Sequence, residues 1–447
     1  MKINLSDNAR YIIDKLQCSG YSCYAVGGCV RDSLMGKEPH DWDFTTSAKP
    51  DEIERVFAEH KTIDIGKRFG TIAVVLDGKP YEITTYRVDM DYSDSRHPDE
   101  VSFSEDIRDD LSRRDFTVNA MAYNDRDGLI DLFEGQKDIE FGVIRCVGSP
   151  KERFEEDALR ILRALRFAST LSFSIEPKTA QAILDERDEL RKIAPERIRD
   201  ELLKLLCGDN VGFVLRRYRT VIAVFIPQLL GTFDFDQRTK HHNRDVYRHT
   251  VAAVQNIEPD PLLRTVMLYH DIAKPLTQTT DKSGVGHYKE HQRFGAAIAR
   301  YSLESLCMPK AFTNEVCMLI RYHDLRLKPE PSQIKRYMNL LGVDAMQKLY
   351  KIRLADTLAQ SMYLREEKLQ NLEEVKTEIE RIAAAGECYN LKMLAVNGSD
   401  LLHMGMTSGE RIGETLDALL EKVINEELPN EKSVLLSYVK NEFDKDE

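Results

Sequence analysis

The sequence predicts an α+β protein in which a sheet-containing head over residues 1–148 precedes a long helical body. Short β-type runs separated by glycine turns fill the head. From residue 151 onward, apolar side chains recur at helical spacing. We find no internal repeat and no low-complexity linker between these two patterns. A sheet region followed by a helical region is the pattern of an α+β fold.

The expected elements follow one another in a clear order. Those of the head are a strand at Tyr24–Val26 ending in a Gly27-Gly28 turn, a helix at Val30–Leu34, a strand at Trp42–Thr45, a helix at Pro50–His60, and a hairpin of Ile72–Leu76 with Tyr81–Tyr86. In the body, one apolar helical face is expected to contain Phe154, Ala158, Ile161, Leu165, Ala168 and Leu171. Further helices are expected at Arg365–Ala385 and Glu410–Ile424.

Length and composition favour a water-soluble protein of two to four domains. The chain has 447 residues, of which 42% are hydrophobic and 31% charged. Its longest apolar runs are far short of a membrane span, and its N-terminus has no apolar signal core. The eight cysteines form no CxxC pair, so we expect reduced thiols. A cytoplasmic location and no membrane partner are the resulting expectations.

The net charge of -12 argues at first against a nucleic-acid partner. The charge is unevenly distributed, because residues 1–150 are acidic whereas residues 191–248 are basic. This division suits a metal site beside a phosphate-binding surface, although ordinary variation of surface charge explains it equally well.

A pair of carboxylates lies close to the glycine turn. Asp41 and Asp43 are two apart in an expected strand and so project from the same face. Like charges placed together favour a hard divalent cation such as Mg²⁺. The Gly27-Gly28 turn lets backbone N–H groups approach phosphate, and Arg31 adds a charged fork. Each feature alone is common, but their ordered occurrence within 17 residues indicates a metal and triphosphate site.

Glu82, on the second strand of the expected hairpin, is a candidate third carboxylate of this site. Because side chains alternate between the two faces of a strand, Glu82 is expected on the same face as Thr84 and Tyr86. An ordinary strand residue fits the pattern equally well.

Four ordered segments carry a resemblance to a known family. AVGGCVRDSLMG…HDWDFTT resembles the first motif of the class II tRNA nucleotidyltransferases and bacterial poly(A) polymerases, in the polymerase β superfamily. DLSRRDFTVNAMAY (110–123) is similar to their second motif, and ERFEEDALRILRALRFA (152–168) to their neck helix. The segment LAVNGSDLLHMGMTSGERIGETLDALLEKVINEELPNE (394–431) resembles the C-terminal region of CCA-adding enzymes.

The resemblance implies a polymerase-β-like head with a mixed sheet, and roles for individual residues. Gly27, Gly28 and Arg31 match triphosphate contacts, and Asp41 and Asp43 match the metal ligands. The positions around the sugar and phosphates are matched by Arg113, Arg114, Asp115 and Asn119. The bare chemistry agrees, since adjacent arginines hold phosphate while an aspartate accepts from a ribose hydroxyl.

The neck segment offers a means of choosing bases without a template. Glu156, Asp157 and Arg160 have the spacing to meet on one helix face, where an ordinary ion pair is the simpler interpretation. In the family, Asp accepts from the exocyclic amine shared by C and A while Arg donates to the base. Arg163 lies further along the same helix face, and it is expected to hold Asp157 and Arg160 in place or to contact RNA phosphate. The polar segment 87–100 resembles the loop that CCA-adding and A-adding enzymes use for the final A.

A second candidate site lies in the helical body. HDIAKPLT places His270 beside Asp271, and the segment resembles an HD-superfamily phosphohydrolase. The expected ligands are His249, His270, Asp271, His291, His323 and Asp324, with Asp324 chosen as the distal aspartate. Imidazole and carboxylate together suit Ni²⁺, Co²⁺ or Mn²⁺. A degenerate HD fold kept as an RNA-binding body is the alternative.

The main hypothesis is a CCA-adding tRNA nucleotidyltransferase that uses ATP, CTP and Mg²⁺. The expected domains are a catalytic head (1–148), a neck (149–230), an HD-type domain (231–335) and a helical tail (336–447). An A-adding enzyme or a poly(A) polymerase stays open. From other classes, an HD phosphohydrolase with an RNA-binding head and an RNA-binding scaffold also stay open. The sequence leaves the oligomeric state undecided, a homodimer included.

Overall fold

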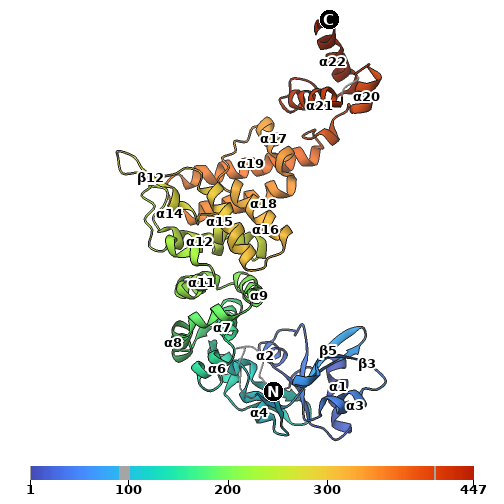
Figure 1. Ribbon diagram of the computed structural model, residues 1–447, viewed down its shortest axis with the longest axis vertical. Coiled ribbons are helices and arrows are strands. Elements are labelled where there is room, and N and C mark those ends of the chain that lie inside the picture. Colours follow the sequence, from blue (N-terminus) through green and yellow to red (C-terminus); the bar gives the residue numbers. More distant parts are fainter. Residues whose placement is uncertain (1, 90–100, 407–408, 447) are drawn as a thin grey trace. The chain divides into compact units, whose positions relative to one another are not determined.

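The computed structural model describes residues 2–89, 101–406 and 409–446. The chain forms two compact units, of which one contains Met1–Leu230 with Ser305–Cys307 and the other Gly231–Glu304 with Met308–Glu447 (Figure 1). Within the described residues, no helix has both the length and the apolar character needed to span a bilayer.

A seven-stranded mixed sheet forms the centre of the head. Its order is β3-β4-β5-β2-β1-β8-β9, in which β2 and β5 are parallel and the other pairs antiparallel. The strands are β1 (Cys23–Val26), β2 (Asp43–Thr46), β3 (Lys61–Gly66), β4 (Thr71–Leu76), β5 (Lys79–Thr85), β8 (Met121–Asn124) and β9 (Gly128–Asp131). The predicted α+β class with a mixed-sheet head is confirmed, as is the predicted hairpin of β4 and β5.

Short helices surround this sheet. They are α1 (Asp7–Cys18), α2 (Gly28–Leu34), α3 (Pro50–Val56), α4 (Ile107–Ser112) and α5 (Gly135–Glu140). Helix α1 begins where the Ser6 side chain accepts from the N–H of Ala9, and it buries Ile12 and Leu16 completely in the main core of the head. The helix predicted up to His60 ends at Val56. Outside the sheet, β6 (Arg87–Asp89) pairs with β7 (Val101–Phe103).

The neck follows the head within the same unit. It contains α6 (Pro150–Glu156), α7 (Leu159–Thr170), α8 (Pro177–Asp185), α9 (Pro195–Leu206), α10 (Val211–Arg217) and α11 (Arg219–Phe225), with a small parallel pair of β10 (Val143–Ile144) and β11 (Ser174–Ile175). The single helix expected here is interrupted, because Asp157 has an extended backbone with φ −144° and ψ 101°. Oδ1 of Asp157 accepts from the N–H of Leu159 at 2.9 Å, which satisfies a free donor at the start of α7.

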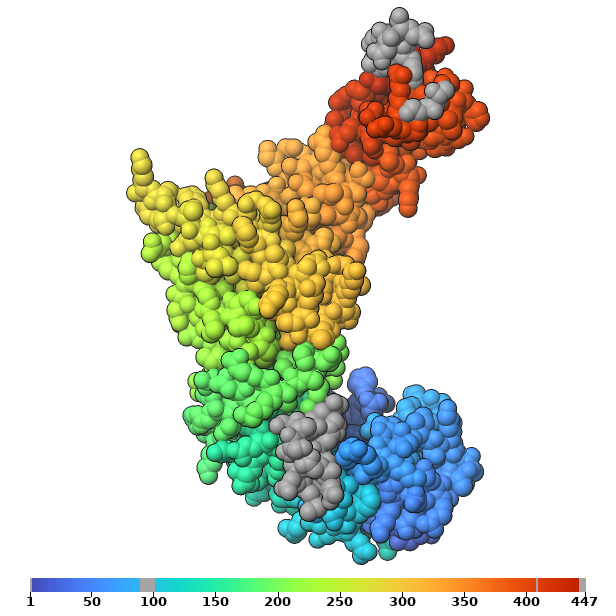
Figure 2. Space-filling view, viewed as in Figure 1, coloured from blue at the N-terminus to red at the C-terminus, as the bar shows by residue number. Residues whose placement is uncertain are grey.

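Helices dominate the second unit. They are α12 (Val246–Asn256), α13 (Pro261–Tyr269), α14 (Lys274–Thr277), α15 (His291–Ser305), α16 (Lys310–Tyr322), α17 (Pro331–Leu341), α18 (Val343–Ala359), α19 (Arg365–Ala385), α20 (Gly398–His403), α21 (Gly409–Ile424) and α22 (Lys432–Asp446). The helix predicted at Arg365–Ala385 is confirmed as α19. A hairpin of β12 (Gln278–Thr280) and β13 (Gly286–Tyr288) was not expected from the sequence, and it projects from the surface of this unit (Figures 1 and 2).

Candidate active site

Strand register brings the predicted carboxylates of the head to one end of the sheet. Asp43, the first residue of β2, pairs with Val26 at the end of β1, immediately before the glycine turn. On its other side β2 runs parallel to β5, and Phe44 is in register with Ile83, so Asp43 and Glu82 occupy adjacent positions. Asp41 and Trp42 precede β2, yet exposure alternates as in a strand, with Asp41 and Asp43 exposed and Trp42 buried.

The charges of these three carboxylates act on one another. Desolvation raises the pKa of Glu82, and the charges of Asp43 and Asp41 raise it further. The pKa of Asp43 is also raised by desolvation, with Arg114 opposing the shift and Asp41 adding to it. Mutual repulsion of this kind is relieved by a bound divalent cation, so the donor set fits a hard metal ion.

Arg114 lies directly beside the glycine turn. Gly27 has a φ of +82°, which favours glycine, and a Cβ at this position would lie 3.2 Å from Nη1 of Arg114. Nη2 of Arg114 donates to Oδ2 of Asp110 at 3.0 Å, and Arg113 pairs with the other oxygen of this fully buried aspartate. Nε of Arg114 is buried without a hydrogen-bond partner. The turn therefore has a fixed cationic side wall that suits a phosphate anion.

A buried polar chain links the other predicted nucleotide contacts. Nη1 of Arg31 donates to Oδ1 of Asn119 at 2.7 Å, and Nδ2 of Asn119 donates to Oδ1 of Asp115 at 3.2 Å. Oδ2 of Asp115 accepts from Nε of Arg163 at 2.8 Å. Burial raises the pKa of Asp115, but Arg163 and Asn119 outweigh that effect and lower it to about 2. Arg31 also pairs with Asp32.

The ordinary ion pair considered for the neck helix is present between Glu156 and Arg160, whereas Asp157 has a partner that was not expected. Oδ2 of Asp157 accepts from Nη2 of Arg197 at 2.8 Å. Arg160 instead forms an ion pair with Glu156 at 2.6 Å, and its Nη2 donates to the carbonyl of Arg113 at 3.0 Å. Asp157 and Arg160 are thus anchored separately, on the two sides of the break between α6 and α7. Arg160 nevertheless connects the neck to the second motif of the head.

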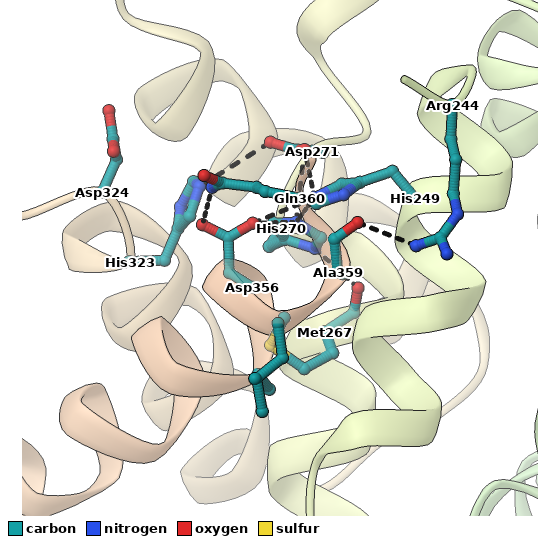
Figure 3. A network of polar contacts seen from close by, with 12 residues as sticks. Arg244, His249, Met267, His270, Asp271, His323, Asp324, Asp356, Ala359 and Gln360 are labelled. Carbon is teal, nitrogen blue, oxygen red and sulfur yellow. Dashed lines mark hydrogen bonds and ion pairs between the residues drawn. The ribbon is translucent and has the colours of Figure 1, made fainter. Parts of the chain in front are cut away.

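The second unit gathers buried histidines around Asp271. Nε2 of His249 and Nε2 of His270 lie 3.4 Å and 3.2 Å from Oδ2 of Asp271. Nε2 of His291 and Nε2 of His323 lie 3.6 Å and 3.8 Å from its Oδ1. Each histidine pair forms, with Asp271, a group whose ligand atoms all lie within 4.8 Å of one another. These are the compact ligand groups among the described residues. Figure 3 shows His249, His270 and His323 around Asp271.

Backbone carbonyls orient three of these imidazoles. Nδ1 of His270 donates to the carbonyl of Met267 at 2.7 Å, and Nδ1 of His323 donates to that of Ile320 at 2.7 Å. Nδ1 of His291 donates in the same way to the carbonyl of Tyr288 at 2.8 Å. Each bond leaves the Nε2 lone pair directed at the cluster, which is the usual arrangement of metal-binding histidines.

Asp356, rather than Asp324, completes this cluster. Oδ1 of Asp356, on α18, lies 2.9 Å from Nε2 of His249. Asp324 lies apart from the cluster (Figure 3), and it forms an ion pair with Arg353 at 3.0 Å. The expectation for Asp324 therefore needs correction: Arg353 contacts both aspartates, but Asp356 is the one whose other oxygen lies beside His249. Helix α18 packs against α12 and α13, so the centre includes a residue beyond the predicted boundary at 335.

The cluster borders a cavity of about 1020 Å³ in the second unit. Asp271, His291, His323 and Asp356 line it, as do several cationic side chains, namely Lys240, Lys274, Lys289, Arg326 and Lys368. His249 and His270 are fully buried behind this lining. An anion of nucleotide size therefore has room beside the cluster.

Three sequence families match successive parts of the chain. Residues 23–145 match "Poly A polymerase head domain", and residues 172–228 match "Probable RNA and SrmB- binding site of polymerase A". Residues 293–439 match "tRNA nucleotidyltransferase domain 2 putative".

Curated relatives extend the match to nearly the whole chain. A CCA-adding enzyme of Lactiplantibacillus plantarum is 33% identical over 97% of this chain and 95% of the relative. One from Staphylococcus aureus (strain MRSA252) is 33% identical over 99% of both chains. The chain belongs to the CCA-adding enzyme family. Its fold agrees, because the crystal structure of the Bacillus stearothermophilus CCA-adding enzyme in complex with CTP is similar with a TM-score of 0.69, at 28% identity over 98% of this chain and 97% of that chain.

Membership in the CCA-adding enzyme family makes the chain a nucleotidyltransferase, and the predicted resemblance to class II tRNA nucleotidyltransferases is confirmed. The polymerase head also implies a divalent metal ion. Our reading of the sequence missed three residues with structural roles at the two sites, namely Asp110, Arg197 and Asp356. Asp110 was detectable, since an aspartate three and four residues before two arginines can pair with both on one helical turn. Arg197 and Asp356 reach their partners across long sequence separations, and we found no local signal for them.

Proposed function

We propose that the chain adds or repairs the CCA sequence at tRNA 3′ ends, using CTP and ATP and releasing pyrophosphate. The observation that carries this proposal is the position of Asp43 between the glycine turn and Glu82 in the sheet register. In the reaction, the 3′-hydroxyl oxygen of the tRNA forms a bond to the α-phosphorus, and the bond from that phosphorus to the β-phosphate oxygen breaks.

The side chains of the head have distinct parts in this reaction. Asp41 and Asp43 would hold Mg²⁺, with Glu82 as a third carboxylate beside them. Bound Mg²⁺ supplies activation of the attacking hydroxyl and charge compensation for pyrophosphate. Gly27, Gly28 and Arg114 provide the phosphate-binding wall.

The neck side chains would choose the base. Asp157 would accept from the exocyclic amine that C and A share at equivalent positions, where U and G carry a carbonyl oxygen instead. Arg197 holds that carboxylate in place by an ion pair of 2.8 Å. Arg160 would donate to the base after leaving Glu156, its partner at 2.6 Å. The buried Asp115 and Asn119, together with the partly exposed Arg163, would support the nucleotide from beneath.

One experiment separates CCA addition from A addition and from poly(A) synthesis. Transcripts of tRNA ending at the discriminator base, at C or at CC are incubated with CTP, with ATP or with both, and the products are sequenced. A CCA-adding enzyme extends all three and stops after the final A. Extension of the CC transcript alone would indicate an A-adding enzyme, and an unlimited A tail a poly(A) polymerase. The loop expected at 87–100 lies largely outside the described residues.

As a second function we propose hydrolysis of phosphate esters at the histidine cluster. The observation in its favour is that three histidines give Nδ1–H to backbone carbonyls and direct Nε2 at Asp271. Neutral imidazoles prefer borderline metals, so Ni²⁺, Co²⁺ or Mn²⁺ should bind there more tightly than Mg²⁺. A phosphate-blocked or cyclic-phosphate tRNA end is a fitting substrate, because it must be opened before nucleotide addition. Hydrolysis of a phosphodiester model substrate with each metal, in wild type and in His270→Ala/Asp271→Ala, tests this function.

A further inference from the structure

We infer that Phe167 is a positioning residue for nucleotide addition, because its ring holds the guanidinium of Arg31 beside the glycine turn. The inference deepens the first proposed function and rests on it, since it concerns the same nucleotide site. Phe167 belongs to α7 of the neck, whereas Arg31 belongs to α2 of the head. The position of a phosphate-binding arginine therefore depends on a ring from the neck.

Three guanidinium groups surround the ring of Phe167. Their Cζ atoms lie 3.9 Å (Arg166), 5.0 Å (Arg31) and 5.6 Å (Arg163) from the ring centroid. The negative face of an aromatic ring attracts a cation within about 6 Å, and more strongly where water is excluded. Phe167 is only 5% exposed, and Phe116 packs against it edge to face at 5.8 Å. The ring is thus a buried, firmly packed surface against which the guanidiniums are held.

Ion pairs compensate the charges of these arginines. Each guanidinium has its own carboxylate, the pairs being Arg31 with Asp32 at 2.7 Å, Arg163 with Asp115 at 2.6 Å and Arg166 with Glu201 at 2.6 Å. The three cations nevertheless converge on one ring, where like charges repel one another. Attraction of each cation to the ring face offsets that repulsion. The ring therefore contributes something that the carboxylates do not.

The orientation of Arg31 matters because its guanidinium lies next to the phosphate-binding turn. A Cβ at Gly28 would lie 3.6 Å from Nη2 of Arg31. Nη1 donates to Asn119 at 2.7 Å, and Nε donates to Asp32 at 2.9 Å. A guanidinium carries five N–H groups, so Nη1 and Nη2 each keep one for a phosphate oxygen. Hydrogen bonds in the plane of the group leave it able to tilt, and the ring opposes that tilt.

The ring closes a set of contacts between the head and the neck. Arg31 donates to Asn119, which donates to Asp115. Asp115 accepts in turn from Arg163 on α7. On the other side, Arg31 and Arg163 both approach the ring of Phe167. Loss of the ring leaves the hydrogen-bonded chain in place, so it should loosen Arg31 without unfolding the head.

The ring should act on triphosphate binding and leave base choice unchanged. Asp157, the proposed base acceptor, is held by Arg197 at 2.8 Å and by the N–H of Leu159 at 2.9 Å. Neither contact involves Phe167. Because CTP and ATP carry the same triphosphate, a misplaced Arg31 raises KM for both. A general loosening of the neck would also relax the rejection of UTP.

Stepwise fluorination of the ring tests the inference, because fluorine withdraws charge from the ring face and barely changes its size. Full-length chains with phenylalanine or its mono-, di- or trifluorinated form in place of Phe167 are made by stop-codon suppression. KM is measured for CTP on a tRNA transcript ending at the discriminator base and for ATP on one ending at CC. We expect both values to rise in steps to about 10-fold, the size of one desolvated cation–π contact. The value of kcat and the rejection of UTP should not change.

Two controls show whether the ring acts through Arg31. In the Arg31→Ala chain, fluorination of Phe167 should no longer change the affinity for CTP, measured by isothermal titration with Mg²⁺ in the absence of tRNA. The same series at Phe154, a fully buried ring of α6, should leave KM unchanged, since no cation lies over that ring among the described residues. Thermal unfolding followed by circular dichroism verifies that each chain folds.

The possible outcomes separate the inference from the function on which it rests. A constant KM across the fluorinated series would overturn the inference even if Phe167→Leu loses activity, because packing alone would then explain the ring. A parallel loss of UTP rejection, or a fluorine effect that persists in Arg31→Ala, would also overturn it. If the wild type extends no tRNA but its CTP affinity falls with fluorination, the inference is supported and the first proposed function is wrong. A wild type that binds no CTP would overturn both.

Discussion

Nη2 of Arg197 lies 2.8 Å from Oδ2 of Asp157, so a residue of α9 fixes a carboxylate at the break between α6 and α7. The other oxygen, Oδ1, accepts from the N–H of Leu159 at 2.9 Å. Both oxygens are thus positioned by the neck itself. An acceptor held in one orientation discriminates between base edges better than a mobile one, because a misplaced edge then loses its hydrogen bond.

Replacing Arg197 should therefore relax base choice. In Arg197→Ala we expect discrimination against UTP and GTP to fall by about 1–3 kcal/mol, as for loss of a good base contact. The measurement is kcat/KM for each nucleotide on a tRNA transcript ending at CC. Asp157→Ala should behave in the same way. Arg191→Ala, whose arginine pairs with Asp188 on the surface, is the matched control. Wild-type discrimination in Arg197→Ala would show that Asp157 needs no such support.

Loss of either metal-binding carboxylate should stop nucleotide addition. Asp41→Ala and Asp43→Ala should each lower kcat by ~100-fold or more, because the compensation of pyrophosphate charge is worth several kcal/mol. Asp51→Ala removes an exposed carboxylate that pairs with Lys67 and should leave the rate unchanged. Near wild-type extension of tRNA by Asp41→Ala would refute the metal assignment.

Protons should compete with the metal ion at this site. The pKa values of Glu82 and Asp43 are raised, first by desolvation and then by neighbouring carboxylates. Both groups therefore take up protons at a higher pH than ordinary carboxylates do, and activity should fall as the pH drops through their raised pKa values. Raising the Mg²⁺ concentration should move this acidic limb to lower pH. Profiles of kcat/KM against pH at two Mg²⁺ concentrations provide the measurement, and a limb that Mg²⁺ does not move would count against this account.

Asp110 should stabilise the head in a pH-dependent way. Burial raises its pKa, but the charges of Arg113 and Arg114 outweigh burial and lower it from 3.8 to about 2. A carboxylate whose pKa is lowered by folding stabilises the folded state fully when the pH is above its pKa in the unfolded chain. This stabilisation is lost as the pH falls through its pKa in the folded protein. Asp110→Asn should therefore cost ~2 kcal/mol at neutral pH and progressively less between pH 3.8 and about 2. Denaturant unfolding at several pH values measures this, with the exposed Glu105→Gln as control. A cost independent of pH would indicate packing rather than charge.

The sequence predicted the parts of the head that depend on local chemistry. Exposure alternates over Asp41, Trp42 and Asp43 as the strand pattern predicts, although β2 begins only at Asp43, and the glycine turn and hairpin have strong local signals. The neighbouring positions of Asp43 and Glu82 were harder to predict from the sequence. They depend on the parallel pairing of β2 with β5, which are not consecutive strands. The break in the helix at Asp157 was also missed. Apolar residues continue at helical spacing across it, whereas the helix is interrupted by a hydrogen bond to the Asp157 side chain.

In the second unit, the sequence identified the histidines but not the distal aspartate. His270 and Asp271 are adjacent, and His249, His291 and His323 stand out by residue type alone. Asp324 and Asp356 were indistinguishable by type, and proximity along the chain favoured Asp324. The difference arises from the packing of α18 against α12, which places Oδ1 of Asp356 2.9 Å from His249, whereas Arg353 contacts both aspartates. Such a choice between carboxylates is made by helix packing rather than by local pattern.

These two aspartates give a matched test of the cluster. Oδ1 of Asp356 lies 2.9 Å from Nε2 of His249, and its Oδ2 accepts from Nε2 of Gln360 at 3.0 Å, so one oxygen is held while the other is directed at the histidines. Asp356→Asn should weaken Mn²⁺ binding at the histidine cluster by ~10–100-fold or more, since it removes a charged ligand. Asp324→Asn should leave Mn²⁺ affinity within about twofold of wild type, because its carboxylate meets Arg353 and not the imidazoles. Isothermal titration with Mn²⁺ in the Asp41→Ala/Asp43→Ala chain measures both. The reverse result, with affinity lost in Asp324→Asn and kept in Asp356→Asn, would restore Asp324 as the distal ligand and require a different packing of α18.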